Sequence, residues 1–310
     1  MPQFYFIPKR LARKAPWLAR AVQWLEAMGF RFIFWLMRLL PLERAKQLAG
    51  FAFGLVGPHS DKATKAKINL AVAFPDTSEA WREQTMRRIF HSLGYSAAEL
   101  IKLEQIWEER DARIDFVVHP GARELMQARR PAIFVSAHVG PWQVAPLVTK
   151  YYELTINTIY APESNPVVAE LMLELRQFLG EKLVSSEDGL RPLIKELKAG
   201  NSINMAMDTR LDSGKLVPFF GRDALTNTSA AGLALRTGAA LVVARAERLP
   251  AGRYRITVYD PLTSPDPEAP QKEQALALTA QINQYFEEWI REYPDQWICL
   301  KRRWPKAHKL

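Results

Sequence analysis

The sequence predicts an α/β fold in which a single sheet is flanked by helices. Short apolar runs of strand length recur between residues 132 and 258, and amphipathic segments of helix length lie between most of them. Strands that alternate with helices form sheets whose faces are covered by those helices. The chain has 310 residues, of which 48% are hydrophobic and 24% charged, so it is long enough to bury a sizeable core.

Residues 1–56 form a basic, aromatic segment that is predicted to associate with a membrane. Residues 1–50 contain nine Lys or Arg residues and two Glu residues, a local net charge of +7 within a total of +9. The apolar window 22–40 also holds Glu26, Arg31 and Arg38, and a charge in the middle of a bilayer costs roughly 2.5–3.5 kcal/mol. We expect a helix that lies in the interface with snorkelling arginines, or a tilted anchor. Packing of this helix on the domain is the alternative, and no cleavable secretory signal is expected.

The elements of a second region, residues 57–310, follow from capping and periodicity. Residues 57–66 are expected to form a polar break. A helix is predicted over 78–107, because Ser78 suits an N-cap and Glu79 and Glu83 lie in the early turns. The remaining elements are expected in the order strand 132–136, helix 142–151, strand 154–160, helix 166–179, strand 182–184, helix 189–198, strand 202–206, helix 230–237, strands 240–245 and 254–258, and helix 271–293. Residues 265–270 are a proline-rich linker inside this domain.

His138 is the first candidate for chemistry, because it directly follows the buried strand 132–136. The chain then enters a Gly140-Pro141 turn, and Gln143 follows five residues after the histidine. A base at a strand end, with a polar partner one turn away, suits the abstraction of a proton from a hydroxyl. A strand-end histidine with a purely structural hydrogen bond is the alternative.

Other chemistries are not indicated. The single Cys299 excludes an internal disulfide framework and a CxxC metal site, and the five histidines have no metal-ligand spacing, so no metal is expected. The G-x-S-x-G, G-x-G-x-x-G and G-x-x-x-x-G-K-[ST] motifs do not occur. Without a nucleophile beside His138, the expected mechanism is direct transfer to a hydroxyl. The basic charge suits an anionic membrane surface or an acidic protein, and no nucleic-acid-binding signature accompanies it.

Several motifs occur together in a fixed order from about residue 30 to 305. His138-x4-Gln143 is preceded by Asn69-Leu70-x3-Phe74-Pro75 and by a helical segment that starts at Phe90 and includes Glu99. It is followed by Asn165-Pro166, by Asp208, by Gly214-x-x-Val217-x-Phe219-Phe220-Gly221, by Pro294-Asp295-Gln296-Trp297 and by Arg302-Arg303-Trp304. Taken together, these motifs resemble the bacterial lipid A biosynthesis (late) acyltransferases, which add secondary acyl chains to the lipid A precursor.

The resemblance implies an acyltransferase-like fold at the cytoplasmic face of a bacterial inner membrane. The donor would be an acyl-carrier-protein or acyl-CoA thioester, used as a co-substrate without a cofactor, and the acceptor a hydroxyl of a lipid A-type glycolipid. His138 would be the general base, since an imidazole of pKa about 6.5 suits neutral pH. Backbone amides near Gly140 and Trp142, at the start of the following helix, or Arg222 would bind the oxyanion. The other expected substrate-binding residues are Asn165, Arg210, Phe219 and Phe220, the phenylalanines as core packing or as a wall for the acyl chain.

Gln143 departs from the family motif, which has Asp or Glu at this position. A glutamine carbonyl accepts a hydrogen bond from Nδ1, but it carries no charge to stabilise an imidazolium. Three explanations remain open: Asp208, at the end of strand 202–206, takes the role; the glutamine is an introduced substitution; or the chain is a weakened or altered paralogue. Asp208 also has a structural alternative, as a turn residue that satisfies loop amides.

Two further departures favour a different acceptor, such as another glycolipid or an aminoacyl lipid. The segment 185–189 lacks an expected basic residue, and Asp208-Thr209-Arg210 replaces a more acidic D-x-D triplet. A catalytically inactive lipid-binding protein with the same fold is the second functional hypothesis, and a basic nucleic-acid binder is the third.

Overall fold

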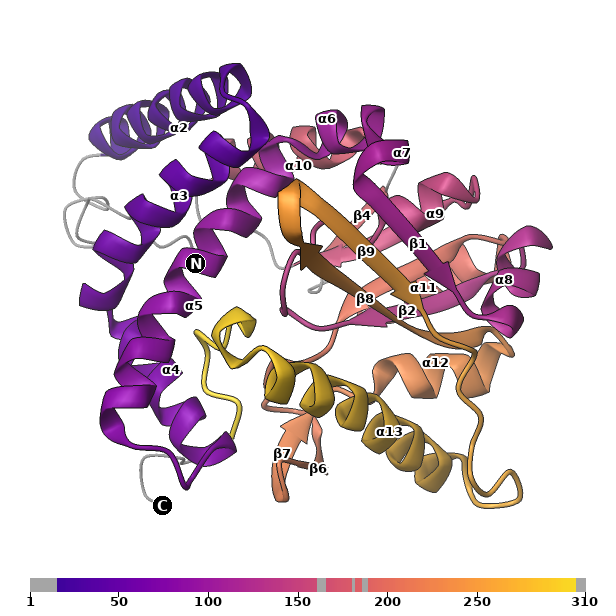
Figure 1. The fold of residues 1–310 in the computed structure, drawn as a ribbon. Helices are drawn as coiled ribbons and strands as arrows, with labels where there is room; N and C mark the ends of the chain where they lie inside the picture. Colours follow the sequence, from indigo (N-terminus) through magenta and orange to yellow (C-terminus); the bar gives the residue numbers. More distant parts are fainter. Residues whose placement is uncertain (1–15, 161–165, 180–181, 186–188, 305–310) are drawn as a thin grey trace.

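A seven-stranded sheet forms the centre of the computed structural model, which describes residues 16–160, 166–179, 182–185 and 189–304 (Figure 1). The strands lie in the order β1-β9-β8-β2-β5-β3-β4. Five of them, from β8 to β4, are mutually parallel, whereas β9 and β1 run in the opposite direction. Their bounds are Ile114–Val118 for β1, Ala132–Ser136 for β2, Ile156–Tyr160 for β3, Lys182–Ser185 for β4, Ser202–Ala206 for β5, Ala240–Leu249 for β8 and Arg253–Val258 for β9. The predicted α/β fold is confirmed.

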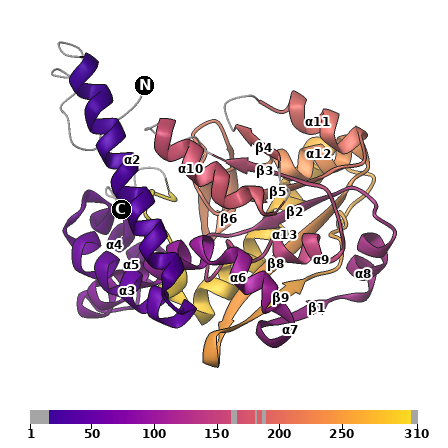
Figure 2. The ribbon, with the colours of Figure 1, turned by 90° about the horizontal axis from the view of Figure 1, so that it is seen from above.

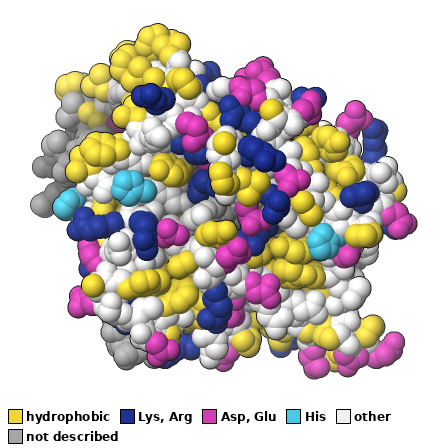
Figure 3. All heavy atoms as spheres, in the orientation of Figure 1, with side chains coloured by type: hydrophobic (Ala, Val, Ile, Leu, Met, Phe, Trp, Pro, Cys, Tyr) yellow, Lys and Arg dark blue, Asp and Glu magenta, His cyan; other side chains and the backbone are white. Residues whose placement is uncertain are grey.

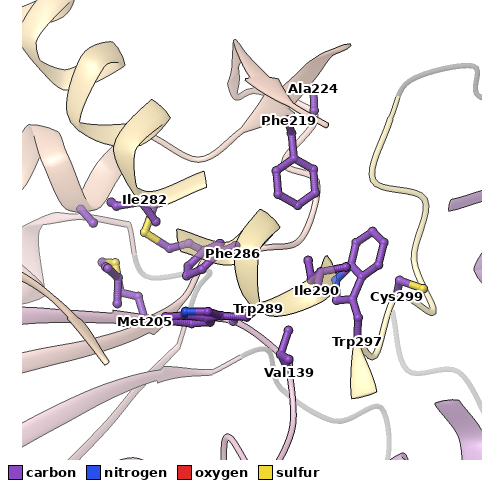
Figure 4. Packing of buried hydrophobic residues seen from close by; sticks show 14 of the residues in the cluster. Val139, Met205, Phe219, Ala224, Ile282, Phe286, Trp289, Ile290, Trp297 and Cys299 are labelled. Carbon is purple, nitrogen blue, oxygen red and sulfur yellow. The ribbon is translucent and has the colours of Figure 1, made fainter. Parts of the chain in front are cut away.

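Helices cover both faces of this sheet. Side chains alternate between the faces of a strand, and in β2 Ala132 and Phe134 enter one core cluster while Ile133 and Val135 enter the other. The first cluster is covered by α6 (Leu103–Glu108), α8 (Pro120–Gln127), α9 (Leu147–Tyr151) and α10 (Pro166–Gln177). The second is covered by α11 (Arg191–Lys198), α12 (Ser229–Thr237) and α13 (Gln271–Glu292). Figure 4 shows this second layer, in which Phe286 and Trp289 of α13 lie beside Met205 of β5.

The first four α-helices of the described chain lie together at one side of the sheet (Figures 1 and 2). They are α2 (Pro16–Leu39), α3 (Leu42–Val56), α4 (Asp61–Ala73) and α5 (Glu79–Ile101). Phe34 and Leu42 reach the core of the sheet, so this part of the chain packs on the domain. The boundary placed at residue 56 stays a prediction.

The polar break predicted at 57–66 is wrong. A short 3-10 helix covers Gly57–His59, and α4 begins at Asp61. Ala63, Ala66 and Leu70 are buried at helical spacing, so the polar residues between them form the outer face of an amphipathic helix. Ser78 does cap α5, its hydroxyl accepting a hydrogen bond from the Trp81 amide at 3.2 Å, but the helix predicted over 78–107 is divided into α5 and α6.

Several helices and strands were not predicted from the sequence. The structure adds β1, α7 (Arg110–Arg113), α8 and a separate hairpin of β6 (Lys215–Phe219) and β7 (Arg222–Thr226). The helix predicted over 142–151 begins only at Leu147, because Pro146 precedes it and the residue before a proline avoids the helical conformation. Residues 142–146 form turns.

The crossing of α3 and α5 depends on Gly94. A Cβ atom at this position would lie 2.4 Å from the Ala49 carbonyl oxygen and 2.7 Å from the Gly50 nitrogen. Because backbone atoms cannot move aside cheaply, Gly94→Ala is expected to destabilise the protein by about 1–3 kcal/mol in urea unfolding. Gly29→Ala in α2 is the control, since nothing lies within 4 Å of its Cβ, and it should be neutral or slightly stabilising. Equal stability of the two variants would contradict the close approach of α3 and α5.

Candidate active site

The register of the central strands brings His138 and Asp208 side by side. In the parallel pair of β2 and β5, Ile133 lies opposite Ile203 and Ser136 opposite Ala206. The same offset of 70 residues, continued two positions beyond each strand, relates His138 to Asp208. Both residues therefore leave the sheet at its carboxyl edge, where open α/β sheets usually bind ligands.

Asp208 holds the imidazole through a direct contact. Its Oδ1 lies 2.7 Å from His138 Nδ1 and also accepts a hydrogen bond from the His138 amide at 3.0 Å. Its Oδ2 accepts a hydrogen bond from Trp297 Nε1 at 3.1 Å. The Asp208 side chain is 1% exposed and that of His138 is 30% exposed. A carboxylate that accepts a hydrogen bond from Nδ1–H keeps the proton on Nδ1. This leaves Nε2 as the atom that can receive a proton from a bound hydroxyl.

The two groups shift each other's pKa. Burial by itself lowers the pKa of His138, but the negative charge of Asp208 and its hydrogen bond outweigh burial, so the pKa of His138 is raised. Burial by itself raises the pKa of Asp208, but the charge and hydrogen bonds of His138 outweigh it, and the pKa of Asp208 is lowered. The pair therefore combines a carboxylate that is ionised at neutral pH with a more basic imidazole.

A C-terminal strap, residues 296–298, fixes the backbone around His138. The Ile298 amide donates to the His138 carbonyl at 2.8 Å, and the Gly140 amide donates to the Gln296 carbonyl at 3.1 Å. Val139 and Trp297 form an isolated antiparallel bridge between the two segments. The sequence analysis missed that Trp297 contacts Asp208, and its place in the C-terminal motif was the only signal for it.

A pocket of about 470 Å³ opens beside this pair. His138, Asp208 and Arg210, all predicted site residues, line it. Its walls also hold Ile159, Met205, Ala206, Met207, Thr209, Leu211, Asn227, Trp297, Ile298, Cys299, Leu300, Lys301 and Arg303. The pocket thus combines an apolar wall with three cationic side chains, which suits a substrate that has an apolar part and an anionic or carbonyl part.

Cys299 is not equipped to be a nucleophile, although it lines the pocket. Burial raises the pKa of its thiol far above neutral, so the thiolate is not formed. Arg303 is buried as well, and burial lowers the pKa of its guanidinium to about 10, which leaves it charged at neutral pH. Among the described residues, no group of three or more His, Cys, Asp and Glu side chains is placed to hold a metal ion.

Gln143 lies against a different side chain. Its Oε1 accepts a hydrogen bond from Arg176 Nη2 at 3.4 Å, whereas the Nδ1 position of His138 is held by Asp208. This geometry matches the first of the three explanations for Gln143. Trp142 contacts the His138 ring edge-on, with ring centroids 5.4 Å apart, and Gly140 adopts a φ of 64° that favours glycine.

The remaining predicted residues lie further out. Phe219 and Phe220 are buried in the core with Trp297 and Trp304, so they pack the hairpin onto the strap. Arg222 is exposed at the start of β7 and is not among the described residues that line the pocket. Arg210, by contrast, lines the pocket, and its Nε donates to Asp212 at 2.6 Å.

Asn165 lies outside the described residues. The helix expected to start just after His138 begins only at Leu147, so its N-terminal amides are separated from the histidine by the turns of residues 142–146.

An imidazole held by a buried carboxylate beside a partly apolar pocket is an arrangement that can activate a hydroxyl for group transfer. The family model described as bacterial lipid A biosynthesis acyltransferase matches residues 12–306, and the chain belongs to this family. It is therefore an acyltransferase, and the resemblance stated from its motifs is confirmed.

Two relatives match most of this chain at 22–28% identity. The lipid A biosynthesis lauroyltransferase of Escherichia coli (strain K12) is 28% identical, over 90% of this chain and 91% of its own length. A lipid A biosynthesis acyltransferase of Haemophilus influenzae is 22% identical, over 87% of this chain and 84% of its own length. A crystal structure of the 1-acyl-sn-glycerophosphate (LPA) acyltransferase PlsC from Thermotoga maritima superimposes with a TM-score of 0.38 and 17% identity, over 78% of this chain and 96% of that one.

Proposed function

We propose that this protein transfers a fatty acyl chain from an acyl-carrier-protein or acyl-CoA thioester to a hydroxyl of a lipid A-type glycolipid precursor. The contact of 2.7 Å between His138 Nδ1 and the buried Asp208, at the wall of a 470 Å³ pocket, carries this proposal. The family membership and the names of the relatives support the acceptor.

The reaction proceeds by direct transfer. His138 Nε2 takes the proton of the acceptor hydroxyl, and the oxygen attacks the thioester carbonyl. Asp208 stabilises the imidazolium, and donors in the pocket stabilise the tetrahedral oxyanion. Arg210 and the backbone amide of Trp142 are the candidate donors, whereas the Gly140 amide is held by the Gln296 carbonyl. Collapse of the intermediate breaks the carbon–sulfur bond, the imidazolium returns its proton to the leaving thiolate, and an ester and a free thiol result.

The protein works at a membrane surface in this proposal, at the cytoplasmic face of a bacterial inner membrane. Figure 3 shows hydrophobic side chains gathered over α2, and Figure 2 shows this helix projecting from the body of the molecule. Large apolar side chains that α2 leaves exposed include Trp17, Trp24, Leu25, Phe32, Trp35 and Leu39. Exposed apolar faces with aromatic side chains and flanking arginines suit the interface of an anionic bilayer. Among the described helices, none is long and apolar enough to cross a membrane.

A different lipid hydroxyl is the second candidate acceptor. Arg210 stands where the family has the second acid of its D-x-D triplet, and its side chain lines the pocket. A cation at this position changes the charge that an acceptor meets, which favours another glycolipid or an aminoacyl lipid.

The test is an acyl-transfer assay that uses the full chain in membranes. Acyl-carrier-protein and acyl-CoA donors are each supplied with a lipid A precursor or with another glycolipid, and products are read by mass spectrometry. We expect an additional ester on the lipid A precursor that disappears in His138→Ala. Transfer only to the other glycolipid establishes the second candidate, and the absence of any His138-dependent product contradicts acyl transfer with these donors.

A further inference from the structure

Strand β8 continues well beyond the end of β2 and lies against the loop that follows β2. This loop contains His138 and Gly140 and is called the His138 loop. In the parallel pair of the two strands, Ala132 lies opposite Ala240 and Val135 opposite Val243. The same offset of 108 residues relates Gly140 to Arg248. A Cβ atom on Gly140 would come within 3.0 Å of the Ala246 carbonyl oxygen, which shows how closely the loop lies on this extension.

Arg248 forms the centre of a buried polar network there. Its Nε donates to Glu99 Oε1 at 2.8 Å and its Nη2 donates to Glu99 Oε2 at 2.9 Å, a bidentate pair in which Glu99 is fully buried. The same guanidinium donates to Ser96 Oγ at 2.8 Å and to the Gly140 carbonyl at 3.3 Å. Ser96 Oγ lies 3.1 Å from the Gly140 carbonyl oxygen and also 3.1 Å from the Ser92 carbonyl oxygen, so these two acceptors share its single proton.

The network also reaches the strap. Arg248 Nη1 donates to Gln296 Oε1 at 3.3 Å, and the Gln296 carbonyl in turn accepts the Gly140 amide. Both polar backbone groups of Gly140 are thus held, the carbonyl by Arg248 and Ser96 and the amide by the strap. One arginine therefore joins α5, the His138 loop and the segment that carries Trp297.

We propose that Arg248, held by Glu99, is a positioning residue that sets the His138 loop so that the imidazole meets Asp208. This inference rests on the proposed function. Asp208 fixes the ring and amide of His138 from the side of β5, whereas Arg248 fixes the same loop from the opposite side, two residues further along. A guanidinium suits this task because its planar fork bonds a carboxylate and further acceptors at once, which an ammonium group cannot do.

The first test replaces the whole charge pair, in the double variant Arg248→Met/Glu99→Leu. Removing both partners leaves no uncompensated buried charge, and such replacements are often tolerated by the fold. Lys46 keeps its partner Glu43 at 3.1 Å. We expect kcat to fall about 10- to 100-fold, because small displacements of a catalytic group cost that much, and KM for the donor to change less than about threefold.

A second readout needs neither donor nor acceptor. Diethylpyrocarbonate modifies the neutral imidazole, so its rate at His138, followed by peptide mass spectrometry across pH, reports the pKa of this residue. A looser contact with Asp208 lowers that pKa, and the acid limb of the kcat profile moves to lower pH with it. Lys301 and Arg176, the other charges that act on His138, are unchanged in the variant. A loss of folded protein alone reduces activity equally at every pH and leaves both profiles in place.

Arg245→Met is the matched control. Arg245 lies on the same strand and is 11% exposed, as is Arg248, but it pairs with Glu292 and Glu247. It should leave kcat and the pKa of His138 unchanged. Ser96→Ala, which removes one hydroxyl, should give a smaller change in the same direction as the double variant and covers the case in which that variant does not fold.

The two proposals fail separately. Wild-type protein that transfers no acyl chain contradicts the proposed function, while the titration of His138 still decides the role of Arg248. Variants at Arg248 and Ser96 that keep the wild-type kcat and the wild-type pKa of His138 would overturn the positioning role.

Discussion

Replacing Asp208 with asparagine is expected to lower kcat about 10⁴-fold, the loss seen in the serine-protease triad when an amide replaces the acid that orients the catalytic histidine. The amide group offers NH₂ to Nδ1 and so favours the wrong tautomer. It also removes the negative charge that raises the pKa of His138. The acid limb of the pH–rate profile should therefore move to lower pH in the residual activity. Initial rates of acyl transfer between pH 5 and 9 measure both effects.

Gln143→Glu is the control for this variant. The side chain of Gln143 accepts from Arg176, so an added carboxylate there forms an ion pair with Arg176 and leaves the contact at Nδ1 as it is. We expect a change in kcat of less than about tenfold, since an exposed or half-buried ion pair is worth about 1 kcal/mol or less. Two results would contradict the role of Asp208: near-normal kcat in Asp208→Asn, or a rise in kcat of several orders of magnitude in Gln143→Glu. Either would identify position 143 as the partner of the His138 imidazole.

Aspartates at Phe32 and Trp35 of α2 are expected to release the protein from anionic vesicles. These side chains are 61% and 57% exposed, so their replacement costs the fold little. Burying a large apolar side chain contributes about 1.5–3 kcal/mol, so the loss of two of them should weaken binding at least a hundredfold. Sedimentation with phosphatidylethanolamine and phosphatidylglycerol vesicles measures the bound fraction.

Leu216→Asp provides the comparison, because Leu216 is also 57% exposed but lies on the hairpin strand β6. It should leave vesicle binding unchanged. Binding of the wild type should also persist at 1 M NaCl, where exposed charges are screened within about 3 Å. A double aspartate variant that still binds fully would place the membrane contact elsewhere, and release of the wild type by salt would make the contact electrostatic.

The parallel strands of the site could be predicted from the sequence residue by residue. The run over Ala132–Ser136 is short and mostly apolar, which is typical of a strand covered on both faces. In Ser202–Ala206 polar Ser202 and Asn204 alternate with apolar Ile203 and Met205, which is the period of a strand. Since both strands end where predicted, His138 and Asp208 were placed two residues beyond the carboxyl edge. The long helix over 271–293 was predicted to within one residue of α13 for a similar reason, its sustained apolar periodicity.

The spacing of residues along the sequence could not show which side chain contacts the imidazole of His138. The motif places Gln143 five residues after His138, but those residues form turns that carry the glutamine to Arg176. Asp208 is 70 residues away in the chain and becomes a neighbour only through the pairing of β2 with β5, which is a tertiary event. The hairpin was missed because exposed and buried residues mix in β6 and because Pro218 is poorly suited to a strand.

The long separations within the site also set the order in which a growing polypeptide acquires its properties. The aromatic face of α2 is complete by residue 39, whereas Asp208 follows His138 by 70 residues and Trp297 follows Asp208 by another 89. Folding during synthesis starts from the N-terminus. An unfinished chain on the ribosome therefore exposes α2 while its histidine still lacks a carboxylate partner. If α2 binds the membrane as proposed, each molecule attaches to the membrane before its site is complete.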